Sequence, residues 1–303
     1  MKIVELRAAE PRPRRLAVGT FDGVHLGHRR VIDGSDTVVT FDPHPATIFA
    51  PRAAPRLLTT LERKAELIAG LGIDELVVVP FDRPLADQGA RQFVERVLVG
   101  ALGATRVAVG ENFRFGHLAE GDPELLRGDD RFETHVEPLL EIDGEVVSSS
   151  HIRGLVLGGA VDYARRLLGA PFAHAGEVVH GDKRGRELGF PTANLVPPDG
   201  FVVPGHGVYA ARATIDGGDD VIAAAVNVGV RPQFQTGRGE LIEAFLIDWS
   251  GDIYGSRLRI EFIKRLRGER RFPSVEALIE QMGQDVVSAR QVTSSEGRGS
   301  SRP

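Results

Sequence analysis

Short runs of apolar, mostly β-branched residues alternate with helical patterns between residues 16 and 136 of the chain. The runs are continuous, as is typical of strands that are covered on both faces of a parallel sheet. They occupy residues 16–18, 37–41, 76–79 and 107–109. Helical patterns lie between the later runs; one follows a capping pattern at Thr59 and ends at Gly72, and the other ends at Gly103. The alternation predicts an α/β, doubly wound fold.

The sequence pattern changes after Pro171. Short apolar runs are now joined by glycine and aspartate turns, which predicts an antiparallel β-barrel. The runs are residues 176–180, 207–213, 221–228, 243–249 and 258–264. Residues 274–290 show the apolar spacing of a terminal helix. We therefore predict two domains, residues 1–169 and 170–292, followed by a disordered tail at 293–303 that is rich in Ser, Gly and Arg.

The composition excludes several classes of chemistry. The 303 residues include no cysteine, which excludes disulfides, thiolate catalysis and cysteine-based zinc sites. A net charge of −5 is not the basic excess of a general nucleic-acid binder. No apolar run approaches the length of a membrane span, and residues 1–15 lack the pattern of a signal peptide. We expect a cytoplasmic protein that binds neither nucleic acid nor membrane, and the oligomeric state stays unknown.

A glycine-rich turn directly follows the first buried run. It extends from Gly19 to His28 (GTFDGVHLGH), and the helix after it is short because residues 33–36 form the next turn. A turn at the carboxyl end of a parallel strand offers backbone N–H groups and a helix N-terminus to an anion. His25 and His28 can lie on one side of this turn and donate to phosphate oxygens. This context favours a phosphate site over two unrelated surface histidines.

Three more polar segments follow predicted strands and are expected at the same sheet edge. They are residues 41–45 (FDPHP), 110–116 (GENFRFG) and 148–153 (SSSHIR). A serine N-cap at Ser150 would place Arg153 in the first turn of a helix, where its guanidinium can face a phosphate. Taken singly, each segment is explained equally well by a proline turn, a polar loop or a simple cap.

The predicted barrel contains a second glycine-rich segment. Residues 181–194 (GDKRGRELGFPTAN) combine three glycines with basic side chains. Thr192 and Asn194, two apart in an extended segment, present oxygen ligands on one side for a phosphate-bound Mg²⁺. The alternative is a basic surface hairpin. Farther along, Glu243 opens the apolar run 243–248, where a carboxylate is either salt-bridged or a general base.

These segments, in this order, resemble those of bacterial bifunctional riboflavin kinase/FMN adenylyltransferases, also called FAD synthetases. The matching residues are 19–28, 40–45, 113–116, 148–153, 181–194, 227–232, 243–248 and 266–272, and the two modules span about residues 16–290. The resemblance implies a six-stranded barrel and two ATP-dependent reactions that use Mg²⁺. Riboflavin would become FMN with release of ADP, and FMN would become FAD with release of pyrophosphate.

The resemblance also implies roles for individual residues. Glu243 would be the catalytic base of the kinase, while His25, His28 and Arg153 would stabilise the departing pyrophosphate. The residues expected to bind ATP or its phosphates are Gly19, Phe21, Asp22, Gly23, Gly27, Ser149, Ser150, Gly181, Lys183, Gly185, Arg186 and Gly189. Those expected to bind the flavin are Asn112, Phe113, Arg114, Phe115, Arg267 and Phe272, and the metal would be held by Thr192 and Asn194.

The sequence leaves two alternatives open. The first is a riboflavin kinase whose N-terminal domain has lost catalysis, because the helix after His28 is shorter than is general in the family. The second is a flavin-binding regulatory protein that uses both sites as sensors. A regulatory protein would have no requirement for Glu243 beside a Mg²⁺ motif, which argues against the second alternative.

Overall fold

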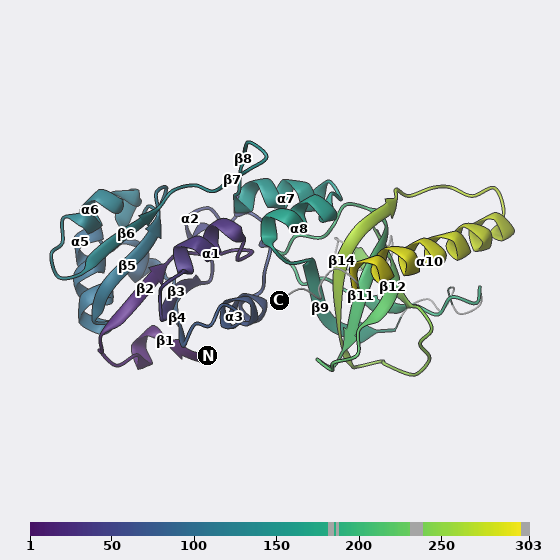
Figure 1. Ribbon diagram of the computed structural model, residues 1–303, viewed down its shortest axis with the longest axis horizontal. Helices are drawn as coiled ribbons and strands as arrows, with labels where there is room; N and C mark the ends of the chain where they lie inside the picture. Colours follow the sequence, from purple (N-terminus) through teal and green to yellow (C-terminus); the bar gives the residue numbers. More distant parts are fainter. Residues whose placement is uncertain (181–184, 186–187, 231–238, 298–303) are drawn as a thin grey trace. The chain divides into compact units, whose positions relative to one another are not determined.

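The chain divides into two compact units, Met1–His151 and Ile152–Pro303. The computed structural model describes residues 1–180, 185, 188–230 and 239–297. The first unit is built on a six-stranded parallel sheet and the second on a closed six-stranded barrel that ends in a helix (Figure 1). Both predicted architectures are confirmed. The division falls between residues 151 and 152 rather than at Gly169, because α8 (Val161–Leu168) packs on two barrel strands.

The strand order of the sheet creates a ligand site at its carboxyl edge. The strands are β1 (Lys2–Glu5), β2 (Arg14–Val18), β3 (Thr37–Asp42), β4 (Glu75–Pro80), β5 (Ala104–Gly110) and β6 (Glu133–Glu137). They lie in the order β1-β4-β3-β2-β5-β6, and all pairs are parallel. The chain runs from β2 outwards to β3 and β4, then crosses to β5 on the other side. The crevice between β2 and β5 is therefore the topological switch point.

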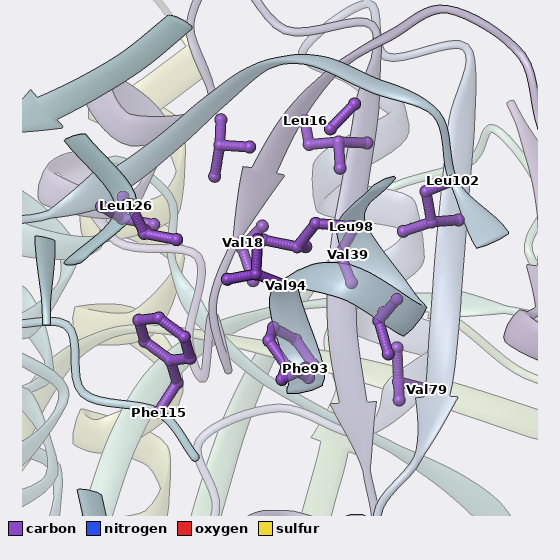
Figure 2. Packing of buried hydrophobic residues seen from close by; sticks show 14 of the residues in the cluster. Leu16, Val18, Val39, Val79, Phe93, Val94, Leu98, Leu102, Phe115 and Leu126 are labelled. Atoms are coloured by element: carbon purple, nitrogen blue, oxygen red, sulfur yellow. The ribbon is translucent and has the colours of Figure 1, made fainter. Parts of the chain in front are cut away.

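Alternate residues of the central strands face two separate hydrophobic clusters. Leu16 and Val18 of β2 pack in the cluster of α5 (Ala90–Phe93) and the π-helical segment η2 (Val94–Ala101), which Figure 2 shows from close by. Ala17, between them in the sequence, packs in the cluster of α1 (Leu26–Ile32) and α3 (Leu61–Ala69). Because both faces are covered, the buried parts of these strands are continuous apolar runs, such as Leu16–Val18 in β2, as the sequence predicted.

The helices of the first unit are short. They are α1 (Leu26–Ile32), α2 (Pro45–Phe49), α3 (Leu61–Ala69), α4 (Arg83–Ala86), α5, η2 and α6 (Pro123–Arg127), with single turns η1 (Leu6–Ala8) and η3 (His117–Ala119). The helix α3 is capped by Thr60, whose hydroxyl accepts the Arg63 amide at 3.1 Å, and not by Thr59 as predicted. It ends at Gly70 rather than Gly72. The hairpin β7 (Glu141–Ile142) and β8 (Glu145–Val146) precedes α7 (Ser149–Leu157).

The barrel closes through a strand that sequence patterns did not show. Its strands are β9 (Phe172–Val179), β10 (Ala193–Leu195), β11 (Gly207–Ile215), β12 (Ile222–Val230), β13 (Glu240–Leu246) and β14 (Arg257–Arg267), in the closed order β10-β13-β12-β11-β14-β9. The strand β10 has only three residues, too few for a periodic pattern, and it pairs with β9 and β13. The sixth strand was expected only from the family resemblance.

The terminal helix α10 (Val275–Gly297) extends beyond its predicted end. Thr293 is buried, and its hydroxyl donates to the carbonyl of Ala289 at 2.9 Å, so the helix continues on the barrel surface. Residues 293–297 are therefore helical, whereas a disordered tail was expected to begin at residue 293; residues 298–303 lie outside the described residues.

Replacing Leu98 with alanine should strongly destabilise the first unit. Leu98 is 1 % exposed in the cluster of Figure 2, so truncation leaves a cavity that costs about 2–5 kcal/mol of unfolding free energy. Scanning calorimetry of the full chain measures the loss. The control is Leu118→Ala, since Leu118 is 84 % exposed and its truncation should cost less than about 0.5 kcal/mol. Equal losses would contradict this account of the core.

Candidate active sites

A cavity of about 670 Å³ lies at the topological switch point of the first unit. Its lining includes Gly19 at the end of β2 and Gly110 at the end of β5. Most of the residues predicted to bind ATP or flavin in this unit also line it. They are Gly19, Phe21, His25, Gly27, His28, Asn112, Phe113, Arg114, Phe115, Ser149 and Ser150. The fold thus brings together three polar segments that are far apart in the sequence.

The two histidines of the glycine-rich turn form a stacked pair. Their ring centroids are 3.5 Å apart with an angle of 17° between the planes, and the edge of Phe21 meets His28. His25 is the N-cap of α1, because its Nδ1 accepts the backbone N–H of His28 at 3.2 Å. Since Nδ1 is an acceptor, the proton of the neutral ring is on Nε2, which leaves Nε2–H as a donor.

Both imidazoles are neutral near pH 7 in the free protein. Burial lowers the pKa of His25 to about 4. Burial also lowers the pKa of His28 well below its ordinary value, and repulsion from His25 and from Lys64 adds to this effect. The Nδ1 atom of His28 is buried and has no hydrogen-bond partner within the described ranges. The pair therefore offers preorganised neutral donors rather than two fixed charges.

Asp22 and Gly23 are not among the residues that line the cavity. The carboxylate of Asp22 accepts the amides of Leu58 and Thr59, at 2.9 and 3.1 Å. The amide of Gly23 donates to the Thr59 hydroxyl at 3.0 Å. A φ of +86° at Gly23 requires glycine there. These two residues hold the glycine-rich turn to the segment before α3, and their expected contact with ATP stays a prediction.

The serine segment closes the cavity where α7 begins. Ser148, and not Ser150, caps α7, because its hydroxyl accepts the amide of His151 at 3.2 Å. The hydroxyl of Ser149 donates to the backbone carbonyl of Asp22 at 2.9 Å and ties the serine segment to the glycine-rich turn. Arg153 follows in the same helix but belongs to the second unit, so its role toward phosphate stays a prediction.

One side of the cavity is aromatic. Phe113 and Phe115 stack with centroids 5.4 Å apart, and Phe49 contacts Phe81 at 5.5 Å. All four rings line the cavity, a surface that suits a flat aromatic ligand. Phe49 and Phe81 were not expected from the sequence, because they follow no motif and reach the cavity only through the packing of α2 and the segment after β4.

Three polar side chains lie in a row across the barrel. Glu243 on β13 pairs in register with Asn194 on β10 and with Asn227 on β12. The Asn227 amide Nδ2 donates to Glu243 Oε2 at 3.2 Å. Asn227 had no role assigned from the sequence, since only the strand register places it beside Glu243. One carboxylate oxygen is thus held by a neutral donor, an arrangement that orients a base.

The row also fits a magnesium ion. Asn194 is 4 % exposed, and its Oδ1 has no hydrogen-bond partner in the described part of the chain. Its Nδ2 donates to the Thr192 carbonyl at 3.3 Å, which directs the amide. The described residues contain no cluster of three or more His, Asp or Glu side chains that could hold a metal. The oxygens of Asn194 and Thr192 suit a Mg²⁺ that takes its other ligands from phosphates and water.

Of the other barrel residues predicted to bind ATP, only two glycines belong to the described residues. Gly181, Lys183 and Arg186 lie outside the described residues, as do Arg231 and Pro232 of the segment 227–232. Gly185 and Gly189 lie in the segment before β10, where the Gly185 carbonyl accepts the Phe190 amide at 2.7 Å.

Arg267, expected to bind the flavin, pairs with a carboxylate of α10 in the structure, and its flavin contact stays a prediction. Its Nε and Nη2 donate to the Asp285 carboxylate of α10 at 3.0 and 2.7 Å, and its Nη1 donates to the Gly268 carbonyl. The guanidinium carbon lies 5.6 Å from the centroid of Phe272. All three guanidinium nitrogens of Arg267 donate hydrogen bonds, and those to Asp285 join α10 to β14. The flavin contact of Phe272 stays a prediction.

The chain matches two family models, FAD synthetase over residues 7–151 and riboflavin kinase over residues 168–293. Bifunctional riboflavin kinase/FMN adenylyltransferases from Bacillus subtilis (strain 168) and Escherichia coli (strain K12) are each 37 % identical over 290 residues. The alignments cover 90 % and 91 % of this chain, and the same shares of those proteins. A crystal structure from Streptococcus pneumoniae described as a macrolide-efflux protein superposes with a TM-score of 0.86 at 27 % identity, covering 96 % of this chain and 99 % of that one.

Among the described residues, no helix has the length and apolar character to span a membrane.

Proposed function

The chain belongs to the bifunctional riboflavin kinase/FMN adenylyltransferase family, and we propose that each of its reactions is carried by the site described in one unit. The chain is a riboflavin kinase and an FAD synthetase that converts riboflavin to FMN and FMN to FAD. The comparisons do not favour a kinase with an inactive partner domain or a flavin-binding regulator. What we propose is the role of each residue in the two reactions and the Mg²⁺ site of the barrel.

In the barrel, Glu243 is the general base. It takes the proton of the terminal ribityl hydroxyl of riboflavin, whose oxygen attacks the γ-phosphorus of ATP, and ADP leaves. Asn227 orients the carboxylate, and the bond from its amide to Glu243 supports this assignment. Asn194 and Thr192 would hold Mg²⁺. The metal, when bound, would neutralise phosphate charge.

In the first unit, the phosphate of FMN attacks the α-phosphorus of ATP and pyrophosphate leaves. The nucleophile is already ionised, so this step needs no base. The observation that carries the proposal is the stacked pair of neutral imidazoles on a turn at the switch point. The Nε2–H of His25 and the ring of His28 donate to the phosphates as charge develops on the leaving group. The aromatic side of the cavity takes the isoalloxazine ring. Arg153 remains a proposed third donor.

A product analysis tests the proposal as a whole. The purified chain is incubated with riboflavin, ATP and Mg²⁺, and the flavins are separated by chromatography. We expect FMN followed by FAD, with ADP and pyrophosphate as the other products. Formation of FMN alone would show that the short helix α1 leaves the first unit inactive. If neither FMN nor FAD formed, the result would support a flavin-binding protein without catalytic activity. Cytoplasmic location, and the absence of nucleic-acid and membrane partners, are proposed from composition alone.

Replacing Asn194 with alanine should raise the Mg²⁺ concentration that half-saturates the kinase by about tenfold or more, because the buried Oδ1 ligand is lost. Titrating Mg²⁺ in separate assays of FMN and FAD formation measures the change. Asn194→Asp, which keeps an oxygen at this place, is the matched control and should stay close to wild type in its Mg²⁺ requirement. A similar rise in both reactions would contradict a local metal role.

A further inference from the structure

A carboxylate lines the cavity of the first unit, and the reaction proposed for this unit does not use it. Glu137 ends β6, and among the described residues that line the cavity it is the only one with a carboxylate. Its side chain is 17 % exposed. A carboxylate repels the phosphates of ATP and FMN. Its place in this cavity therefore implies that it faces an uncharged part of a substrate that donates hydrogen bonds.

Hydrogen bonds fix the position of Glu137 at the end of its strand. Its backbone carbonyl accepts the amide of Glu111, the residue after β5, at 2.9 Å, and Oε1 of Glu111 accepts the amide of Leu139 at 3.2 Å. On the side chain, Oε2 of Glu137 lies 3.3 Å from Nε2 of His135. In the described part of the chain, Oε1 of Glu137 has no hydrogen bond. This oxygen can accept a hydrogen from a ligand.

The segment after Glu137 forms an aliphatic part of the cavity. Pro138, Leu139 and Leu140 line it, together with Val147. The Leu140 carbonyl accepts the Val147 amide at 2.8 Å, and Val147 directly precedes the serine segment. The aliphatic part thus lies beside the serines that are proposed to hold phosphate. An apolar surface with one acceptor at its end suits a flat ring that carries an amino group.

Both substrates of the first unit bring a ring system into the cavity. The larger one, the isoalloxazine, is assigned to the aromatic side with its four phenylalanine rings. The adenine remains for the aliphatic part, which adjoins the serine segment as adenosine adjoins its phosphates. The 6-amino group of adenine is a donor, whereas a 6-oxo purine carries an acceptor at the same place. An ionised carboxylate only accepts, so it attracts the first group and repels the second.

We propose that Glu137 determines the nucleotide specificity of the adenylyltransferase, because it accepts a hydrogen bond from the 6-amino group of adenine and rejects purines with a 6-oxo group. The proposal rests on the proposed function of the first unit. The histidines and serines contact phosphates, which all nucleoside triphosphates share, so they cannot make this choice. A site that pairs one polar group with the correct substrate rejects an analogue that leaves this group unpaired.

Replacing Glu137 with glutamine should change the nucleotide preference of FAD formation. ITP is the probe, since it differs from ATP in carrying a 6-oxo group. The glutamine keeps the shape of the side chain, and its NH2 group can donate to the 6-oxo group. The ratio of kcat/KM for ATP to that for ITP should fall about tenfold or more. Glu137→Ala is a second variant, which should also lower this ratio because it removes the acceptor and the repulsion together.

The matched control is Glu133→Gln, because Glu133 is an exposed carboxylate of the same strand and is not among the residues that line the cavity. It should keep the wild-type ratio. In Glu137→Gln, neither the KM for FMN nor the nucleotide preference of FMN formation in the barrel should change. A raised KM for FMN with an unaltered ATP-to-ITP ratio would overturn the proposal, and it would place a donor of the flavin beside Glu137.

Nucleotide binding without catalysis gives a second readout. ATP or ITP is titrated into the full chain in the absence of FMN, and the NMR signals of the His25 and His28 rings report occupancy, because both rings line the cavity. The Kd for ITP divided by that for ATP should fall about tenfold in Glu137→Gln. If the wild type bound ATP but made no FAD, the proposed function would fail while this quotient still tested Glu137. The same quotient in wild type and variant would overturn the proposal.

Discussion

Replacing Glu243 with glutamine should stop FMN formation while FAD is still made from supplied FMN. The amide preserves the shape of the side chain but cannot take the proton of the ribityl hydroxyl. We expect the turnover of the kinase to fall on the order of a hundredfold or more, as is typical when a general base is removed. The position of Glu243 between Asn194 and Asn227 makes it the carboxylate best placed for this task.

The measurement is the rate of FMN formation from riboflavin, with FAD formation from FMN assayed on the same preparation. Glu177→Gln is the matched control, because Glu177 is an exposed carboxylate on the barrel strand β9 and should have wild-type rates. Unchanged kinase turnover in Glu243→Gln would end the assignment of Glu243 as the base. Loss of both activities would indicate a folding defect.

Replacing His28 with alanine should weaken FAD formation and leave the kinase untouched. Loss of one preorganised donor costs about 2–4 kcal/mol of transition-state stabilisation, which is roughly 30- to 900-fold in kcat/KM. The neutral state of the ring matters here, because an uncharged donor can strengthen its hydrogen bond as charge develops on the pyrophosphate. The loss should therefore fall on kcat more than on the KM for ATP.

The control for His28→Ala is Arg30→Ala in the same helix, since Arg30 is exposed. Calorimetry establishes that both variants remain folded, which matters because His28 packs against His25 and Phe21. The two residues compared share a helix of seven residues, so a general weakening of α1 would affect both. Equal losses in the two variants would place the effect in the helix and not in the imidazole.

The short helix α1 is compatible with the proposed phosphate site. Anions at a helix N-terminus are held by groups of the first turn, and α1 retains that turn although it ends at Ile32. The strand runs, the glycine-rich turn and the order of the motifs are local properties, so the doubly wound sheet, the barrel and the family followed from them. The comparisons confirmed the fold class and the two activities.

Several features depend on contacts between distant residues, and only the tertiary structure decided them. The sequence shows Asp22 inside a phosphate motif, yet its carboxylate binds the amides of Leu58 and Thr59, and Arg267 pairs with Asp285 across the barrel surface. Lys64 is polar in the sequence but buried in the fold. A local pattern fixes how each segment folds and which chemistry it carries. Which groups then meet is set by strand order and register, and these place Asn227 beside Glu243.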